Sequence, residues 1–179
     1  MKTLILYSSY DGQTQKIAQF LAEKLSAEVR SINENVDDLA EFDRIIIGAA
    51  IRYGHFNKLL YKFIEKNTAL LNHKQTAFFG VNLTARKADK NTPETNVYVR
   101  KFLQRISWKP SLSAVFAGAL FYPRYGWFDR MMIKFIMFLT GGETDTRREI
   151  EYTDWQKVAE FAEQFSTIKN DKFSPHFAE

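Results

Sequence analysis

Apolar residues in this chain fall into two patterns: short unbroken runs, and longer stretches in which they recur every three or four positions. An unbroken run is typical of a strand buried on both faces of a parallel sheet. Five runs predict strands, the second being the weakest: 3–8, 28–32, 44–48, 76–82 and 114–120. The helical spacing predicts four helices: 14–25, 59–71, 94–106 and 153–165. We expect Thr153 to be the N-cap of the last helix.

Strands and helices alternate along the 179 residues, and this alternation predicts an α/β fold with one doubly wound parallel sheet. Each parallel connection needs a crossover, and the helices supply the crossovers. The length suits a single domain that covers residues 1–179. We expect residues 169–179 to form a frayed tail.

The composition is that of an ordinary globular protein, with 45% hydrophobic and 26% charged residues. It argues against a disordered chain, a fibrous repeat and a polytopic membrane protein. The chain has no cysteine, which excludes disulfides, thiolate metal sites and catalytic thiols, so redox chemistry needs a bound cofactor. The apolar start is too short for a signal peptide, and we therefore expect the cytoplasm.

Positive charge is mild over the whole chain, at +4, but it is concentrated between residues 86 and 109. Seven lysine and arginine residues stand there against two acidic residues. The segment favours a partner that carries negative charge.

The loop that follows the first predicted strand, 8–14, is the first candidate site, because doubly wound sheets bind ligands at the carboxyl ends of their strands. The hydroxyls of Ser9 and Thr14, the flexible Gly12 and the N–H groups at the start of the next helix can surround a phosphate. The loop lacks the glycine patterns of Walker and dinucleotide motifs. It resembles the flavodoxin phosphate loop except at Asp11, which we expect to turn outward or to cap the helix. An ordinary capped turn has the same composition, so both interpretations stay open.

Two later loops also follow central strands and contain groups that suit a flat, polar-edged ligand. Residues 48–55 combine small residues with Arg52, Tyr53 and His55, and residues 82–87 offer amide, hydroxyl and cationic groups. Solvated loops are the alternative for each. A receiver-type regulator of similar topology is excluded, since it needs an aspartate where the third strand ends in Ile-Gly-Ala-Ala.

The segment at about 121–142 is unusually apolar and aromatic. Eight large apolar side chains cover about half of a helical wheel: Trp127, Phe128, Met131, Met132, Phe135, Ile136, Phe138 and Leu139. A helix of this length reaches about 20 Å, short of the roughly 30 Å hydrocarbon layer, so we expect no membrane span. We expect it to lie in a membrane interface, with Arg124, Arg130 and Lys134 toward anionic headgroups. A core helix or a dimer-interface helix is the alternative.

Several further motifs make the resemblance more specific than that of the loop at 8–14 to flavodoxins. They are Ile51-Arg52-Tyr53-Gly54-His55, Val81-Asn82-Leu83 with Ala85-Arg86-Lys87, Tyr122-Pro123-Arg124-Tyr125, and Gly-Gly-Glu-Thr-Asp-Thr-Arg at 141–147. With them the chain resembles the menaquinone-dependent protoporphyrinogen oxidases, from Lys2 to about Ser166. The resemblance implies a flavodoxin-like five-stranded sheet in the order 2-1-3-4-5, with the apolar segment inserted between the fifth strand and the last helix.

The resemblance also implies an activity. Such a protein is an FMN enzyme of haem biosynthesis, a protoporphyrinogen IX dehydrogenase that oxidises protoporphyrinogen IX to protoporphyrin IX and passes the electrons to a respiratory quinone, menaquinone or ubiquinone. It works as a peripheral protein on the cytoplasmic face of the inner membrane, with no metal and no nucleic acid as partner. The sequence leaves the oligomeric state open, and a homo-oligomer is compatible with it.

Site residues follow from the same resemblance. The expected FMN-binding residues are Ser9, Tyr10, Asp11, Gly12, Gln13, Thr14, Ile51, Arg52, Tyr53, Gly54, Asn82, Leu83, Thr84, Ala85 and Arg86. Those expected to contact the substrate or the membrane are Lys87, Arg124, Tyr125, Trp127, Arg130 and Lys134, with Arg86 as a further candidate. His55, followed by Tyr53, is the candidate for proton transfer, chosen by location.

Three rival functions remain to be compared. A flavodoxin-type electron carrier is usually acidic, whereas this chain carries +4 and the apolar segment. An NAD(P)H quinone reductase needs a nucleotide pocket, for which the chain shows no separate motif. A non-catalytic binding module would not hold a flavin, so the spectrum of the purified protein would separate it from the others.

Overall fold

The computed structural model describes residues 1–34 and 36–168 of the chain. At its centre lies a parallel sheet in the order β2-β1-β3-β4-β5. Its strands are β1 (Thr3–Ser8), β2 (Glu28–Ser31), β3 (Arg44–Ala50), β4 (Gln75–Asn82) and β5 (Leu112–Ala117). The predicted doubly wound sheet and its order are confirmed. The tail expected at 169–179 lies outside the described residues.

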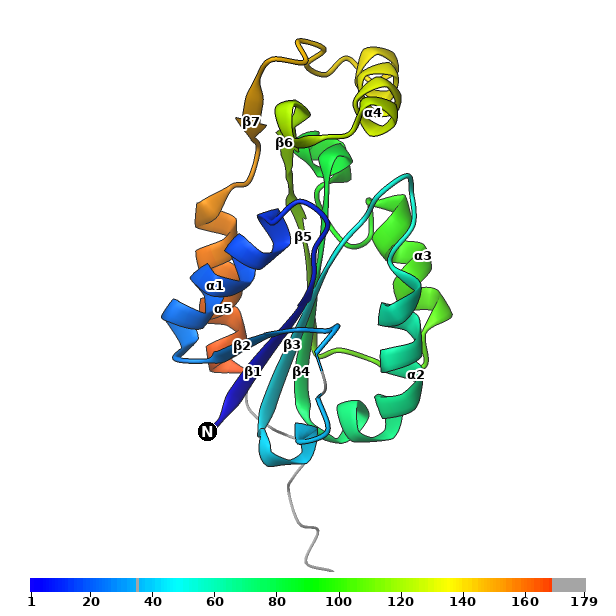
Figure 1. Cartoon of the computed structure of the whole chain (residues 1–179). Helices are drawn as coiled ribbons and strands as arrows, with labels where there is room; N and C mark the ends of the chain where they lie inside the picture. The colour runs from blue at the N-terminus through cyan, green and yellow to red at the C-terminus, as the bar shows by residue number, and fades with distance from the viewer. Residues whose placement is uncertain (35, 169–179) are drawn as a thin grey trace, which may run out of the picture.

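Helices cover both faces of the sheet (Figure 1). One face carries α1 (Gln13–Leu25) and α5 (Trp155–Thr167), and the other carries α2 (Lys58–His73) and α3 (Val97–Arg105). Successive side chains of β3 point to opposite faces, so that Ile46 packs with the α1 and α5 side while Ile45 and Ile47 pack with the α2 and α3 side. Because both faces are buried, the strand shows no polar alternation.

The prediction of one strand at 114–120 was wrong. β5 ends at Ala117, and a separate strand β6 (Ala119–Phe121) pairs antiparallel with β7 (Glu149–Glu151) in a small two-stranded sheet. The N–H of Gly118 donates to the carbonyl of Asn82 (3.1 Å), where β4 ends. Beyond this point β4 no longer offers a partner, so the next residues pair with β7 as strand β6.

Two helix starts also differ from the prediction by two residues or more, those of α3 and α5. Asp154, not Thr153, caps α5, because its carboxylate accepts from the N–H groups of the first turn. The Thr153 hydroxyl donates to the carbonyl of Ala117 (2.7 Å) and so fastens the end of β5. The helix predicted from residue 94 begins at Val97, since the side chain of Asn96 accepts from the Val99 N–H as its N-cap.

The apolar segment forms α4 (Trp127–Leu139), which lies with β6 and β7 beyond the carboxyl ends of the sheet strands (Figure 1). Of its side chains only Ile133 and Met137 are buried, in a cluster with Leu120 and Tyr122. Short 3-10 helices complete the description: η1 (Leu39–Glu41), η2 (Leu83–Arg86), η3 (Ala88–Lys90) and η4 (Tyr122–Arg124). Within the ranges that the structure describes, no helix is both long and apolar enough to cross a bilayer.

Candidate functional site

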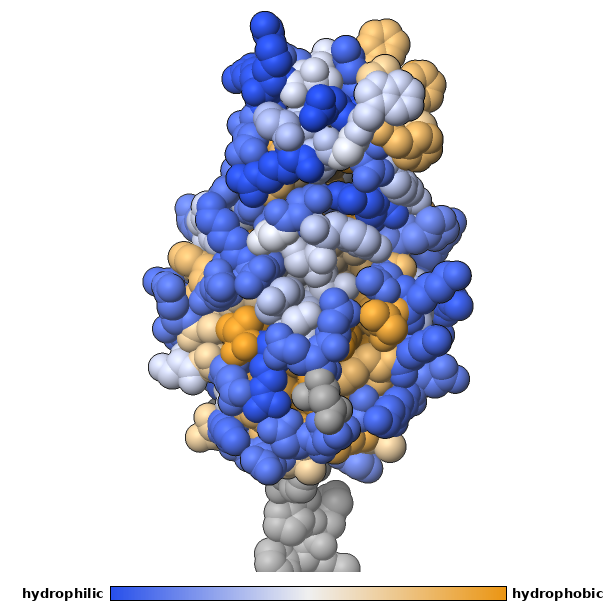
Figure 2. Space-filling model, viewed as in Figure 1, coloured by the Kyte–Doolittle hydropathy of each residue, from blue (hydrophilic) through white to orange (hydrophobic). Residues whose placement is uncertain are grey.

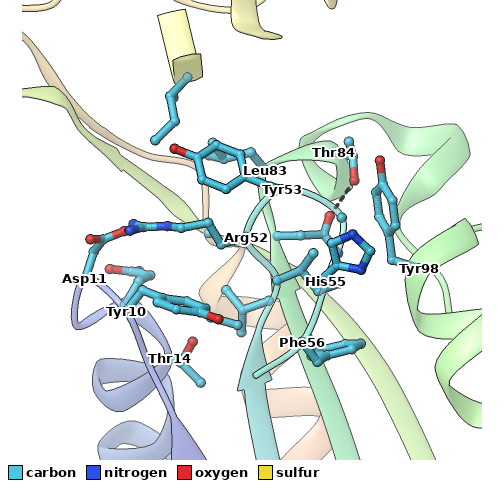
Figure 3. A pocket seen from close by; sticks show the side chains of 18 of the residues that line it. Tyr10, Asp11, Thr14, Arg52, Tyr53, His55, Phe56, Leu83, Thr84 and Tyr98 are labelled. Atoms are coloured by element: carbon cyan, nitrogen blue, oxygen red, sulfur yellow. Dashed lines mark hydrogen bonds and ion pairs between the residues drawn. The ribbon is translucent and has the colours of Figure 1, made fainter. Parts of the chain in front are cut away.

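A cavity of about 900 Å³ lies where the sheet strands end, with α4 on its far side. Its volume is near the upper end of the range of about 300–1,000 Å³ that is typical of ligand sites. The loops after β1, β3 and β4, one face of α3 and the inner face of α4 line it, and Figure 3 shows residues of the three loops and of α3 at the site. The cavity therefore lies at the edge of the sheet where the sequence predicts a ligand site.

The loop after β1 forms one end of the cavity. Gly12 has a φ of +96°, a left-handed conformation that glycine adopts without strain, and its N–H donates to the Ser9 hydroxyl (3.0 Å). Thr14, at the start of α1, is 1% exposed, yet its hydroxyl has no hydrogen-bond partner within the described residues. Buried hydroxyls nearly always have a partner. A phosphate at the N-terminus of α1 would satisfy this one, so these residues fit the phosphate of FMN.

Asp11 neither turns outward nor caps α1, so this expectation was wrong. Its carboxylate forms an ion pair with Arg52, which reaches across from the loop after β3. The Arg52 guanidinium also lies over the Tyr10 ring, 4.8 Å from its centre (Figure 3). Burial lowers the pKa of Arg52, but the hydrogen bond and charge of Asp11 outweigh it and hold the pKa above its ordinary value. The pair neutralises an anionic side chain that would otherwise repel a phosphate.

The same loop is tied to α4 through Asp129. The Tyr53 hydroxyl donates to the Asp129 carboxylate, and a guanidinium nitrogen of Arg52 lies 3.8 Å from its other oxygen. Burial, together with the hydrogen bond to Asp129, raises the pKa of Tyr53 to about 12, so this phenol keeps its proton at neutral pH. Tyr53 and Gly54 both have positive φ, and a side chain at Gly54 would approach the Tyr98 ring to 3.1 Å. The turn at Tyr53 and Gly54 therefore contacts α4 through Asp129 and packs close to α3 at Tyr98.

Asn82 organises the loop after β4. Its side-chain oxygen accepts from the Ala85 N–H (2.9 Å) and the Thr84 hydroxyl (2.6 Å), and its amide pairs with that of Asn96. Beyond this turn, the Arg86 guanidinium donates to the carbonyl of Leu83 (2.8 Å) and to the hydroxyl of Thr140 at the end of α4 (3.0 Å). Arg86 thus joins the floor of the cavity to its α4 wall.

Most residues expected from the sequence come together at this cavity. Those that line it are Ser9, Tyr10, Asp11, Gln13, Thr14, Ile51, Arg52, Tyr53, Gly54, His55, Asn82, Leu83, Thr84, Arg86 and Tyr125. Those that do not are Gly12, Ala85, Lys87, Arg124, Trp127, Arg130 and Lys134. Two of the latter are engaged elsewhere: Arg124 pairs with Glu149 (2.7 Å), and Arg130 donates to the carbonyls of Tyr122 and Tyr125.

Sequence reasoning missed the α3 side and the α4 wall of the cavity. The missed residues are Tyr61, Tyr98, Lys101, Phe102, Arg105, Met132, Ile133, Ile136, Met137 and Thr140. The excess of positive charge at 86–109 was a signal for Lys101 and Arg105, but it did not single them out. The apolar pattern of the segment includes Met132 and Ile136, but it does not predict which of its apolar side chains face the cavity.

The outer face of α4 is exposed. Its large apolar side chains face solvent with exposed fractions of 76% for Trp127, 57% for Phe135 and 72% for Phe138. Figure 2 shows hydrophobic side chains gathered over this helix on a surface that is otherwise mainly hydrophilic. Since most of these side chains are exposed, α4 is not a core helix of the described chain, and that alternative is excluded.

Comparison with known proteins agrees with this architecture. The flavodoxin domain model matches residues 4–147. Over 174 residues the chain is 51% identical to protoporphyrinogen IX dehydrogenase (quinone) of Escherichia coli, covering 94% of this chain and 96% of the relative. It is 48% identical to the protein of the same name from Leishmania major, covering 93% of this chain and 75% of that relative.

Solved structures support the fold. Oxidised flavodoxin 2 from Bacillus cereus matches with a TM-score of 0.52 and 19% identity, over 93% of this chain and 98% of that one. Oxidised flavodoxin 1 from the same organism matches with a TM-score of 0.52 and 17% identity, over 94% of this chain and 100% of that one. The chain therefore belongs to the flavodoxin family and, within it, to the family of the protoporphyrinogen IX dehydrogenases (quinone).

Proposed function

We propose that this chain oxidises protoporphyrinogen IX to protoporphyrin IX and delivers the electrons to a membrane quinone, menaquinone being the expected acceptor in haem biosynthesis. The observation that carries the proposal is the cavity, which joins a polar end at the loop after β1 to an apolar wall made by α4. The identity of 51% to a protoporphyrinogen IX dehydrogenase (quinone) supports the same assignment.

FMN is the cofactor of this oxidoreductase, and the loop after β1 is the part that would hold its phosphate. The Thr14 hydroxyl and the N–H groups at the start of α1 suit the phosphate, while Arg52, Tyr53 and the Asn82 turn lie where the flavin ring would be flanked. When bound, FMN would supply two-electron redox chemistry between the substrate and the quinone, used three times for the six-electron oxidation of the porphyrinogen, with three quinones reduced.

The side chains of this chain position the reactants and control water and protons. The inner face of α4, with Ile133 and Met137, lines one side of the cavity with apolar groups and would limit water at the reacting ring. Tyr53 is protonated at neutral pH, with burial and then Asp129 raising its pKa, and its hydroxyl donates to the Asp129 carboxylate on α4. His55 lines the cavity and is exposed to solvent, so it suits the transfer of a substrate proton to water.

We also propose that the outer face of α4 rests in the interface of the inner membrane, on its cytoplasmic side. Porphyrinogen and quinone are both hydrophobic, and α4 carries exposed apolar groups on one face and cavity-lining groups on the other. Such a helix would connect the lipid phase with the cavity. Lys134, on the same helix, would face anionic headgroups.

The experiment that tests the function is an anaerobic oxidation assay. FMN-loaded protein is mixed with protoporphyrinogen IX, a menaquinone analogue is added, and porphyrin fluorescence is followed. We expect a fluorescence increase that depends on both protein and quinone. Free FMN with quinone, without protein, is the control for spontaneous oxidation. A rate no greater than in that control would refute the proposed function.

A further inference from the structure

The cavity carries an uneven charge. Among the described residues, four cationic side chains line it, Arg52, Arg86, Lys101 and Arg105, and Asp11 is the single lining carboxylate. Arg52 and Asp11 neutralise each other. No carboxylate of the described residues forms an ion pair with any of the other three cations. By contrast, Arg124, outside the cavity, pairs with Glu149.

Two of these cations are arranged as a pair on α3. Lys101 and Arg105 are four residues apart, which places them on one face of the helix with Cβ atoms about 5–6 Å apart. The Arg105 guanidinium lies over the Tyr61 ring, 4.5 Å from its centre, and this contact favours one orientation of a long side chain. Lys101 and Arg105 line the cavity from α3, and Figure 3 shows Tyr98, on the same helix, on the opposite side of the site from Thr14 on α1.

We propose that Lys101 and Arg105 bind the two propionate carboxylates of the porphyrinogen. This inference rests on the proposed function and names the substrate-recognition residues of the same site. Two propionates on neighbouring pyrrole rings leave the macrocycle on one side, so two cations one helical turn apart match them. Charge-assisted hydrogen bonds from lysine and arginine to carboxylates are the strong kind.

The arrangement also separates the anionic groups of the two ligands. The phosphate of FMN belongs at the α1 end and the propionates belong at the α3 end, which limits repulsion between them. The macrocycle then lies toward the apolar wall that Met132 and Ile136 provide. This assignment replaces Arg124 and Arg130, whose guanidinium groups are bound to Glu149 and to main-chain carbonyls.

The test compares the diacid with its dimethyl ester, which lacks both charges. In Lys101→Gln/Arg105→Gln we expect KM for protoporphyrinogen IX to rise by about tenfold, as two partly exposed ion pairs would give. KM for the dimethyl ester should stay unchanged, and so should FMN affinity. The affinity for protoporphyrin IX, measured by fluorescence titration, should fall in parallel, which gives a readout independent of turnover. The conservative variant Lys101→Arg/Arg105→Lys should keep most of the preference for the diacid.

Lys90→Gln/Arg100→Gln is the matched control, because it removes the same charge from the same segment without altering the lining of the cavity. Its KM should equal that of the wild type. An unchanged KM for the diacid in the α3 variant would overturn the inference, and so would an equal rise for diacid and ester, which indicates a structural role. If the α3 double variant loses FMN, the single variants Lys101→Gln and Arg105→Gln are tested instead. Each should raise KM for the diacid by about threefold, and an unchanged KM in both would overturn the inference. A wild type inactive on both substrates would instead remove the proposed function.

Discussion

The hydroxyl of Thr14 is buried without a partner in the described residues, and at the residue scale this makes it the clearest support for the proposed phosphate site. Replacement by valine keeps the size of the side chain and removes the hydroxyl. We expect Thr14→Val to weaken FMN binding by about tenfold, since a hydrogen bond to a charged group contributes about 1.5–3 kcal/mol. The apoprotein should be at least as stable as the wild type, because an unsatisfied buried group is lost. FMN titration and urea unfolding measure the two effects.

Thr68→Val is the matched control for this substitution. The Thr68 hydroxyl donates to the carbonyl of Ile64 within α2, away from the cavity. Its FMN affinity should equal that of the wild type. An equal affinity in Thr14→Val would show that the hydroxyl does not contact the phosphate.

At the scale of elements, α4 has two apolar faces with different tasks. Ile133 and Met137 point into the molecule, whereas Phe135 and Phe138 are exposed. We expect Phe135→Ser/Phe138→Ser to reduce binding to anionic phosphatidylglycerol vesicles by tenfold or more, because full burial of one such side chain contributes about 1.5–3 kcal/mol. Vesicle sedimentation and the emission of the exposed Trp127 both measure binding.

The control for this experiment removes exposed apolar groups from other helices. Leu59 on α2 and Val97 on α3 are exposed by 48% and 38%. Leu59→Ser/Val97→Ser should bind vesicles like the wild type. An undiminished interaction of the α4 variant would show that its outer face is not the membrane contact, and an equal loss in both variants would indicate unspecific adsorption.

The tether between α4 and the loop after β3 can be tested through Tyr53. Asp129 raises the pKa of Tyr53 through its hydrogen bond and its charge, although burial is the larger cause. In Asp129→Asn we therefore expect this pKa to fall from about 12 while staying above its ordinary value of 10. Absorbance titration of tyrosinate, compared with a Tyr53→Phe background, measures it. Asp89→Asn, on the exposed η3, should leave the titration unchanged, whereas an unchanged value in Asp129→Asn would contradict the tether.

At the scale of the whole molecule, the tyrosines around the cavity make stability depend on pH. Burial raises the pKa of Tyr122 to about 12, and its hydroxyl donates to the carbonyl of Glu143 (2.7 Å). Between pH 10 and 12 the unfolded chain has released this proton and the folded chain has kept it. The folded state then binds more protons, so the free energy of unfolding falls as the pH rises.

Tyr122→Phe isolates this contribution. Below pH 10 we expect the variant to be less stable by about 1 kcal/mol, because it lacks the hydrogen bond. Between pH 10 and 12 the difference should shrink by on the order of 2 kcal/mol, at 1.36 kcal/mol for each pH unit, and should reverse sign. Urea unfolding at several pH values measures it. Parallel curves for both proteins would show that Tyr122 titrates alike in the folded and unfolded chains.

The chain shows how far a sequence predicts a fold of this kind. The runs around Ile46 and Phe79 predicted buried strands correctly, because a doubly covered sheet makes every strand position apolar. The boundary at Gly118 was missed, since β5 ends only because β4 ends beside it. The prediction of Thr153 as the cap was wrong because threonine and aspartate can both accept hydrogen bonds from the first turn of a helix. Asp154 accepts these bonds, and the Thr153 hydroxyl donates to the carbonyl of Ala117 instead.

The amino-acid sequence alone determined the alternation of strands and helices, the glycine turn around Gly12 and the apolar character of 121–142, because each depends on neighbours along the chain. The tertiary structure decided which groups meet. It paired Asp11 with Arg52, brought Asp129 to Tyr53 and turned Lys101 and Arg105 toward the same cavity as Thr14. These contacts join residues that lie on different elements, and their distances follow from how the elements pack rather than from local pattern.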